Sequence, residues 1–91
     1  MSVDVEIYMN NIIKFFKDNP KELLNLIPVD KEDEFYDKVR QVANLNYEKG
    51  SDCTLTKMQM INICRDLNQE KKSHKIPIGL LYTKYGLVSL N

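Results

Sequence analysis

Apolar residues recur at three- and four-residue spacing along the first two thirds of the chain, which is typical of helices with one buried face. The spacing predicts four helices, at about residues 3–18, 20–27, 31–49 and 57–68. Pro20 ends the first, because proline disfavours helical backbone in the residue before it. Asn19 is expected to cap the second helix, with Glu22 reaching back to that cap. Gly50 is expected to end the third in the left-handed conformation.

The start of the fourth helix carries the most specific local signal. Thr56 and Gln59 have the spacing of a capping box, in which each side chain accepts a hydrogen bond from the backbone N–H of the other residue. Leu55 and Met60 occupy the two positions of a hydrophobic staple. These four residues predict a helix that begins at residue 57.

The C-terminal part of the chain changes to an alternating pattern. It predicts a β-hairpin at about residues 78–90, with Gly86 in the left-handed position of its turn, after a polar linker at 69–76. The expected fold is therefore α+β, one small domain of residues 1–91 with three to four helices and a C-terminal hairpin. Its core is expected to contain Ile12, Phe16, Leu23, Leu26, Phe35, Val39, Val42, Met60, Ile61, Cys64, Leu67, Tyr82 and Val88.

Length and composition indicate one globular core. The 91 residues are 43% hydrophobic and 29% charged, and 13 basic side chains balance 13 acidic ones. The charges are unevenly distributed, since residues 1–55 hold 7 basic and 11 acidic side chains and residues 56–91 hold 6 and 2. Basic groups near aromatic rings can bind nucleic acid, and the candidate contacts are Lys57, Arg65, Lys71, Lys72, Lys75, Lys84 and Tyr85, with Tyr82 nearby. Attraction between the two oppositely charged parts, or simple solvation, explains the same asymmetry.

No arrangement of reactive residues in the sequence indicates catalysis. His74 is the only histidine and stands in a lysine-rich stretch without an evident partner. Cys53 and Cys64 lack the paired spacing of a zinc site; Cys64 is expected in the core, and Cys53 in a loop as a partly exposed thiol. The carboxylates of residues 32–34 and 37 are expected to be solvated at the start of a helix. We therefore expect a protein that is not an enzyme and has no metal, cofactor or small-molecule substrate.

Targeting signals are not evident in the sequence. The first residues are acidic where a secretory signal would be basic, and no apolar run approaches the ~20 residues that span a bilayer. Two thiols without a signal peptide fit a reducing compartment. We expect a cytoplasmic protein with no membrane partner.

Three sequence blocks, at residues 8–16, 23–28 and 55–60, resemble small uncharacterised proteins of marine tailed phages and ocean metagenomes. The closing residues 83–86 and 90–91 are similar as well. The resemblance implies an accessory role in the cytoplasm of a host cell, and it implies no activity or site residues.

Two functions from different classes are compatible with these features. The first is a non-catalytic protein-interaction or accessory protein, bound to a protein partner or to further copies of itself. Apolar residues outside the main stripes are its candidate interface: Ile7, Phe15, Ile63 and Leu87. The alternative is a nucleic-acid-binding regulator that uses the basic C-terminal third.

Overall fold

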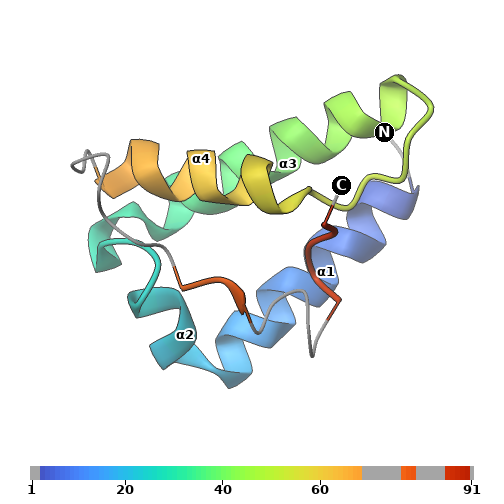
Figure 1. Ribbon diagram of the computed structural model, residues 1–91. Helices are drawn as coiled ribbons and strands as arrows, with labels where there is room; N and C mark the ends of the chain where they lie inside the picture. Colours follow the sequence, from blue (N-terminus) through green and yellow to red (C-terminus); the bar gives the residue numbers. More distant parts are fainter. Residues whose placement is uncertain (1–2, 69–76, 80–85, 91) are drawn as a thin grey trace.

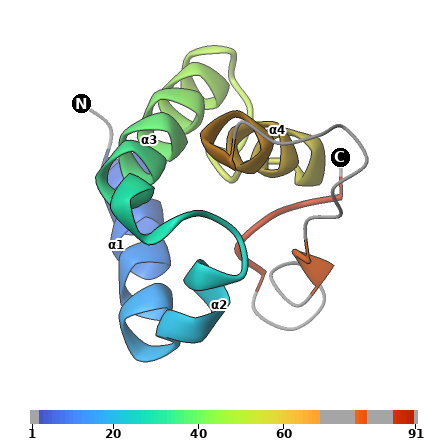
Figure 2. The ribbon, with the colours of Figure 1, turned by 90° about the vertical axis from the view of Figure 1, so that its left-hand side faces the viewer.

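The computed structural model describes residues 3–68, 77–79 and 86–90. Within these residues the helices are α1 (Val3–Asp18), α2 (Pro20–Leu24), the short 3-10 helix η1 (Val29–Lys31), α3 (Glu32–Glu48) and α4 (Lys57–Asn68). Helices α3 and α4 run antiparallel, side by side, and form an upper layer above α1 and α2 (Figure 1). The end-on view places α1 beneath α3 and the C-terminal segment 86–90 beneath α4 (Figure 2).

The predicted helices are confirmed, with a correction at the α1–α2 junction. Asn19 does not cap α2 with its side chain. Its Nδ2 donates instead to the carbonyl oxygen of Phe15 at 2.9 Å, and its backbone N–H donates to the same carbonyl at the end of α1. Helix α2 is also shorter than predicted, because the backbone turns after Leu24 and the N–H groups of Leu26 and Ile27 both bond to Leu23.

The predicted end of helix α3 at Gly50 is confirmed. Gly50 has a φ of 84°, in the left-handed region. Its N–H bonds to the carbonyl of Tyr47, and the N–H of Ser51 bonds to that of Asn46, both at 3.0 Å. This pair of bonds is a Schellman motif, which closes the helix and turns the chain toward α4.

The capping box at the start of α4 is confirmed in both directions. The backbone N–H of Thr56 donates to Oε1 of Gln59 at 2.9 Å, and the N–H of Gln59 donates to Oγ1 of Thr56 at 3.1 Å. Leu55 and Met60, the two staple positions, are fully buried. These contacts lie within six residues of each other, which explains why the sequence predicts them.

The prediction of an α+β fold with a C-terminal hairpin is wrong. The described residues are mostly helical and contain no strand, only an isolated parallel bridge between Thr56 and Ser89. In that bridge the N–H of Ser89 donates to Leu55 at 2.9 Å, and Ser89 accepts from the N–H of Lys57 at 2.7 Å. Gly86 has the expected positive φ of 66°, although the residues after it pair with the segment before α4. The linker at 69–76 and positions 80–85 of the predicted hairpin lie outside the described residues.

The core lies between the α3–α4 layer and α1, and the Phe16 and Phe35 rings meet edge to face there with centroids 5.7 Å apart. Val42 and Ile61 are partly buried against it, and Tyr82 lies outside the described residues. The other predicted core residues are confirmed as buried: Ile12, Phe16, Leu23, Leu26, Phe35, Val39, Met60, Cys64, Leu67 and Val88. The core also contains Tyr8, Leu55 and Ile78, which are not among the predicted core residues.

Candidate functional site

The predicted interface residues do not form one surface. Ile7 is 54% exposed, whereas Phe15, Ile63 and Leu87 are buried inside the chain. They belong to the core because α1, α4 and the C-terminal segment each present a wider apolar face than a single stripe. This part of the interface prediction is therefore corrected: of the four residues, Ile7 alone is exposed.

Most of the predicted nucleic-acid contacts are not among the described residues. Lys71, Lys72, Lys75, Lys84 and Tyr85 lie outside the described residues, as do His74 and Tyr82. The remaining two, Lys57 and Arg65, are both half-buried on α4. Nε of Arg65 is buried and has no hydrogen-bond partner among the described residues. Nucleic-acid binding by the basic third stays a prediction.

The two thiols occupy environments that oppose reactivity. Both cysteines are free and buried, so the expected partial exposure of Cys53 is wrong. Burial raises the pKa of Cys64 to about 12. Burial, reinforced by the neighbouring carboxylate of Asp52, also raises the pKa of Cys53. Both groups are therefore neutral thiols near pH 7, and a neutral thiol is a poor nucleophile.

The carboxylates at the start of α3 are solvent-exposed, as predicted. Within the described part of the chain, no three His, Cys, Asp or Glu side chains lie close enough together to hold a metal ion.

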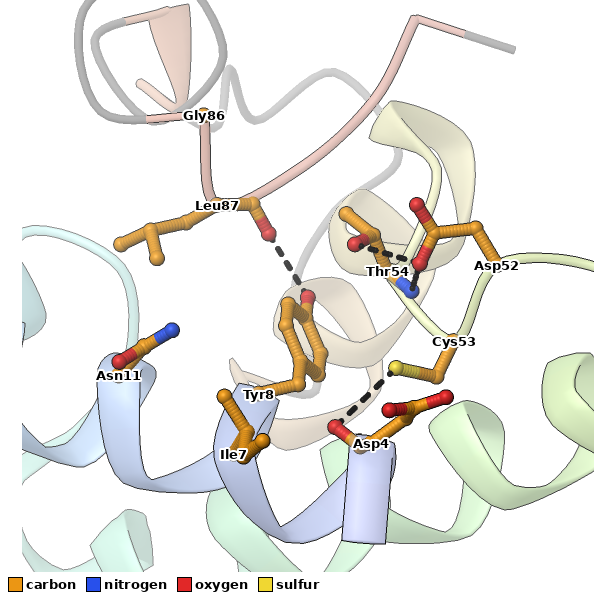
Figure 3. Close-up of a pocket in the computed structure, with 9 residues that line it drawn as sticks. All are labelled: Asp4, Ile7, Tyr8, Asn11, Asp52, Cys53, Thr54, Gly86 and Leu87. Carbon is orange, nitrogen blue, oxygen red and sulfur yellow. Dashed lines mark hydrogen bonds between the residues drawn. The ribbon is translucent and has the colours of Figure 1, made fainter. Parts of the chain in front are cut away.

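A cleft of about 410 Å³ opens between α1, the loop before α4 and the C-terminal segment (Figure 3). Several of its polar groups hydrogen-bond within the chain. The Cys53 thiol donates to the backbone carbonyl of Asp4 at 3.5 Å, and Oδ1 of Asp52 accepts from both N and Oγ1 of Thr54 at 3.1 Å. These bonds shape the loop and its packing on α1.

Tyr8 stands at the back of this cleft and joins three segments. Its hydroxyl donates to the carbonyl of Leu87 at 2.7 Å and accepts from the N–H of Leu55 at 3.1 Å. In a parallel pair, the next rung after the Ser89 bonds would connect Leu55 N–H directly to Leu87 C=O. The tyrosine hydroxyl bridges these two groups where the backbones diverge. Burial raises the pKa of Tyr8 well above its usual value, so the hydroxyl keeps its proton.

A second concavity, of about 300 Å³, runs between α3 and α4 on the upper layer. Helix α3 contributes Lys38, Gln41, Val42, Leu45, Asn46 and Lys49, and helix α4 contributes Gln59, Asn62, Ile63 and Asp66. We refer to this surface as the α3–α4 groove.

A reciprocal amide pair crosses the α3–α4 groove. Nδ2 of Asn46 donates to Oε1 of Gln59 and Nε2 of Gln59 donates to Oδ1 of Asn46, both at 3.0 Å. Gln59 also belongs to the capping box, so one side chain both starts α4 and fixes its register against α3. One helical turn from this pair, Val42 and Ile63 give the groove an apolar floor.

Leu45 is the exposed leucine of the groove, and it was not among the predicted interface residues. It is 53% exposed and lies on α3 immediately beside the buried Asn46. The available signal was a lone leucine outside the stripe of Phe35, Val39 and Ala43, but a single exposed leucine is common on protein surfaces. Only the position of α4 shows that this leucine borders a groove.

Comparisons with protein-family models, with curated proteins and with solved structures found no match. Among the helices described by the structure, none combines the length and the apolar character needed to cross a membrane.

Proposed function

We propose that this protein is a small non-catalytic protein-binding domain and that the α3–α4 groove is its binding surface. The observation that carries the proposal is the half-exposed Leu45 at the edge of a groove whose floor is apolar and across which the amides of Asn46 and Gln59 already bond to each other. The apolar part of this surface gains by burial against a partner, and the paired amides of Asn46 and Gln59 lose few hydrogen bonds to water in the process. An accessory role in the cytoplasm of a phage host is part of this proposal, and the sequence resemblance supports it.

The chemistry of the other concave surface favours binding over catalysis. Around the cleft at α1, the hydroxyl of Tyr8 and the thiol of Cys53 are committed to backbone groups, and burial keeps both protonated. Neither group is available to abstract or donate a proton without breaking the contacts that hold the fold.

The contribution expected from Leu45 follows from its exposed area. Complete burial of a leucine side chain stabilises by about 1.5–3 kcal/mol, so burying the exposed half is worth about 1 kcal/mol. An aspartate there must also be desolvated, and the Leu45→Asp change is expected to weaken binding about tenfold or more. Leu24 on α2 is a matched control, because it is 56% exposed and does not line the groove.

Site-specific photo-crosslinking in an extract of the native cells tests the proposal. A photoreactive residue at Gln41 in the groove is expected to give a discrete protein adduct, and one at Lys21 on α2 is not. The Leu45→Asp change should abolish the adduct, and the Leu24→Asp change should leave it intact. Absence of an adduct from Gln41, or its equal loss with both aspartate variants, would overturn the assignment.

A further inference from the structure

We infer that the α3–α4 groove binds a second copy of this chain, in a symmetric dimer whose two-fold axis runs along the groove. This inference rests on the proposed function and names the partner of the same surface. It is carried by the distribution of charge on the two banks of the groove. Both charged lining residues on α3 are basic, Lys38 and Lys49, and the charged lining residue on α4 is acidic, Asp66.

The heights of these charged residues along the groove follow from the position of the amide pair. Asn46 and Gln59 bond to each other, so they lie at the same height on the two antiparallel helices. Lys38 precedes Asn46 by eight residues and Asp66 follows Gln59 by seven. At 1.5 Å per residue, both lie roughly 11–12 Å from the pair, toward the same end of the groove. Lys38 and Asp66 therefore lie at the same height along the groove, on opposite banks.

A two-fold axis along the groove brings these opposite charges of the two copies together. Rotation about that axis preserves the direction of each helix and exchanges the banks, so α3 of one copy lies antiparallel to α4 of the other. Lys38 of each copy then meets Asp66 of the second copy, which gives two equivalent ion pairs. Leu45 of each copy lies over the apolar floor of the other, and four antiparallel neighbours form a bundle.

The charges also disfavour the other face-to-face arrangement. A two-fold axis perpendicular to the helices would place α3 opposite α3, with Lys38 of one copy at the level of Lys49 of the other. Like charges brought together in this way are repulsive, and the acidic residue on α4 would have no basic counterpart on the facing bank. Charge complementarity therefore selects the axis along the groove.

Charge exchange tests the dimer. The wild-type chain is expected to have a solution mass by light scattering of twice 10.7 kDa. Lys38→Glu and Asp66→Lys should each raise the dimer dissociation constant about tenfold or more, because each creates two like-charged contacts. An equimolar mixture of the two variants should restore association as a heterodimer, since both contacts then join opposite charges. The doubly substituted chain should associate with itself again.

Controls separate this outcome from misfolding and from failure of the proposed function. Lys21→Glu makes the same change in net charge as Lys38→Glu but lies outside the groove, and it should leave the dimer unchanged. All variants should keep the helix content of the wild type by circular dichroism. A monomeric wild-type chain, single variants that dimerise as tightly as wild type, or a mixture that fails to associate would each overturn the dimer. If the Gln41 crosslink then contains a different protein, the groove remains a binding surface and only the second copy is wrong.

Discussion

Replacing Tyr8 by phenylalanine removes one oxygen atom from the junction of α1, the segment before α4 and the C-terminal segment. The ring remains in the core, but the N–H of Leu55 loses its acceptor and the carbonyl of Leu87 loses its donor. Both bonds are buried. Because the aromatic ring is unchanged, the substitution isolates the hydrogen bonds from hydrophobic packing.

The expected loss follows from the two bonds. A hydrogen bond contributes about 0.5–1.5 kcal/mol net, and a buried donor left without an acceptor costs about 1–3 kcal/mol. Water in the adjoining cleft can reach the carbonyl of Leu87, which lowers the total. We expect the Tyr8→Phe change to destabilise the protein by about 2–3 kcal/mol. For 91 residues the whole stability is about 5–14 kcal/mol, so this is a large fraction of it.

Urea unfolding followed by circular dichroism measures this loss. The slope with denaturant should stay unchanged and the midpoint should fall, because the folded surface remains the same. Tyr47→Phe is the matched control, since Tyr47 is about half exposed; its effect should remain within about 0.5 kcal/mol. Amide hydrogen exchange gives a local readout, because the N–H of Leu55 should lose protection in the Tyr8 variant.

One result would contradict the bridging role of the Tyr8 hydroxyl. If Tyr8→Phe unfolds at the same urea concentration as Tyr47→Phe and the amide of Leu55 stays protected, the hydroxyl does not bridge the two backbones. The C-terminal segment would then be held by its apolar side chains, Leu87 and Val88.

Two further predictions concern α3 and α4. Asn46→Ala and Gln59→Ala should each destabilise by about 1–3 kcal/mol, and a double-mutant cycle by urea unfolding should give a coupling energy of about 1–2 kcal/mol; additive losses would show that the amides act separately. Burial raises the pKa of Cys64 from 9.0 to about 12, so above about pH 9 the unfolded chain releases a thiol proton that the folded chain keeps. Stability should therefore fall as pH rises from about 9 to about 12, by up to about 1.4 kcal/mol per pH unit, and unfolding of the Cys64→Ala variant should show a shallower decline; parallel curves would contradict this.

The sequence determined the local structure of this protein. The end of α1 depends on Pro20, the end of α3 on Gly50 and the start of α4 on the Thr56–Gln59 capping box. The hydrogen bonds that close α3 and form the capping box connect residues at most five positions apart. Such contacts require no knowledge of distant segments. The buried stripe of each helix follows from its spacing for the same reason.

The partner of the C-terminal segment and the identity of the exposed residues depend on how the helices pack. Alternation around Gly86 satisfies the local rules for a hairpin, but Ser89 bonds to Leu55 and Lys57, more than thirty residues away. Phe15, Ile63 and Leu87 are buried for a similar reason, since only the assembled helices show which side chains are covered. The groove beside Leu45 exists only where α3 and α4 lie side by side, with the amides of Asn46 and Gln59 bonded across it. A pattern along the chain predicts the secondary structure of each segment. The partner of a backbone group or of an apolar face depends on which distant segments the folded chain places beside it.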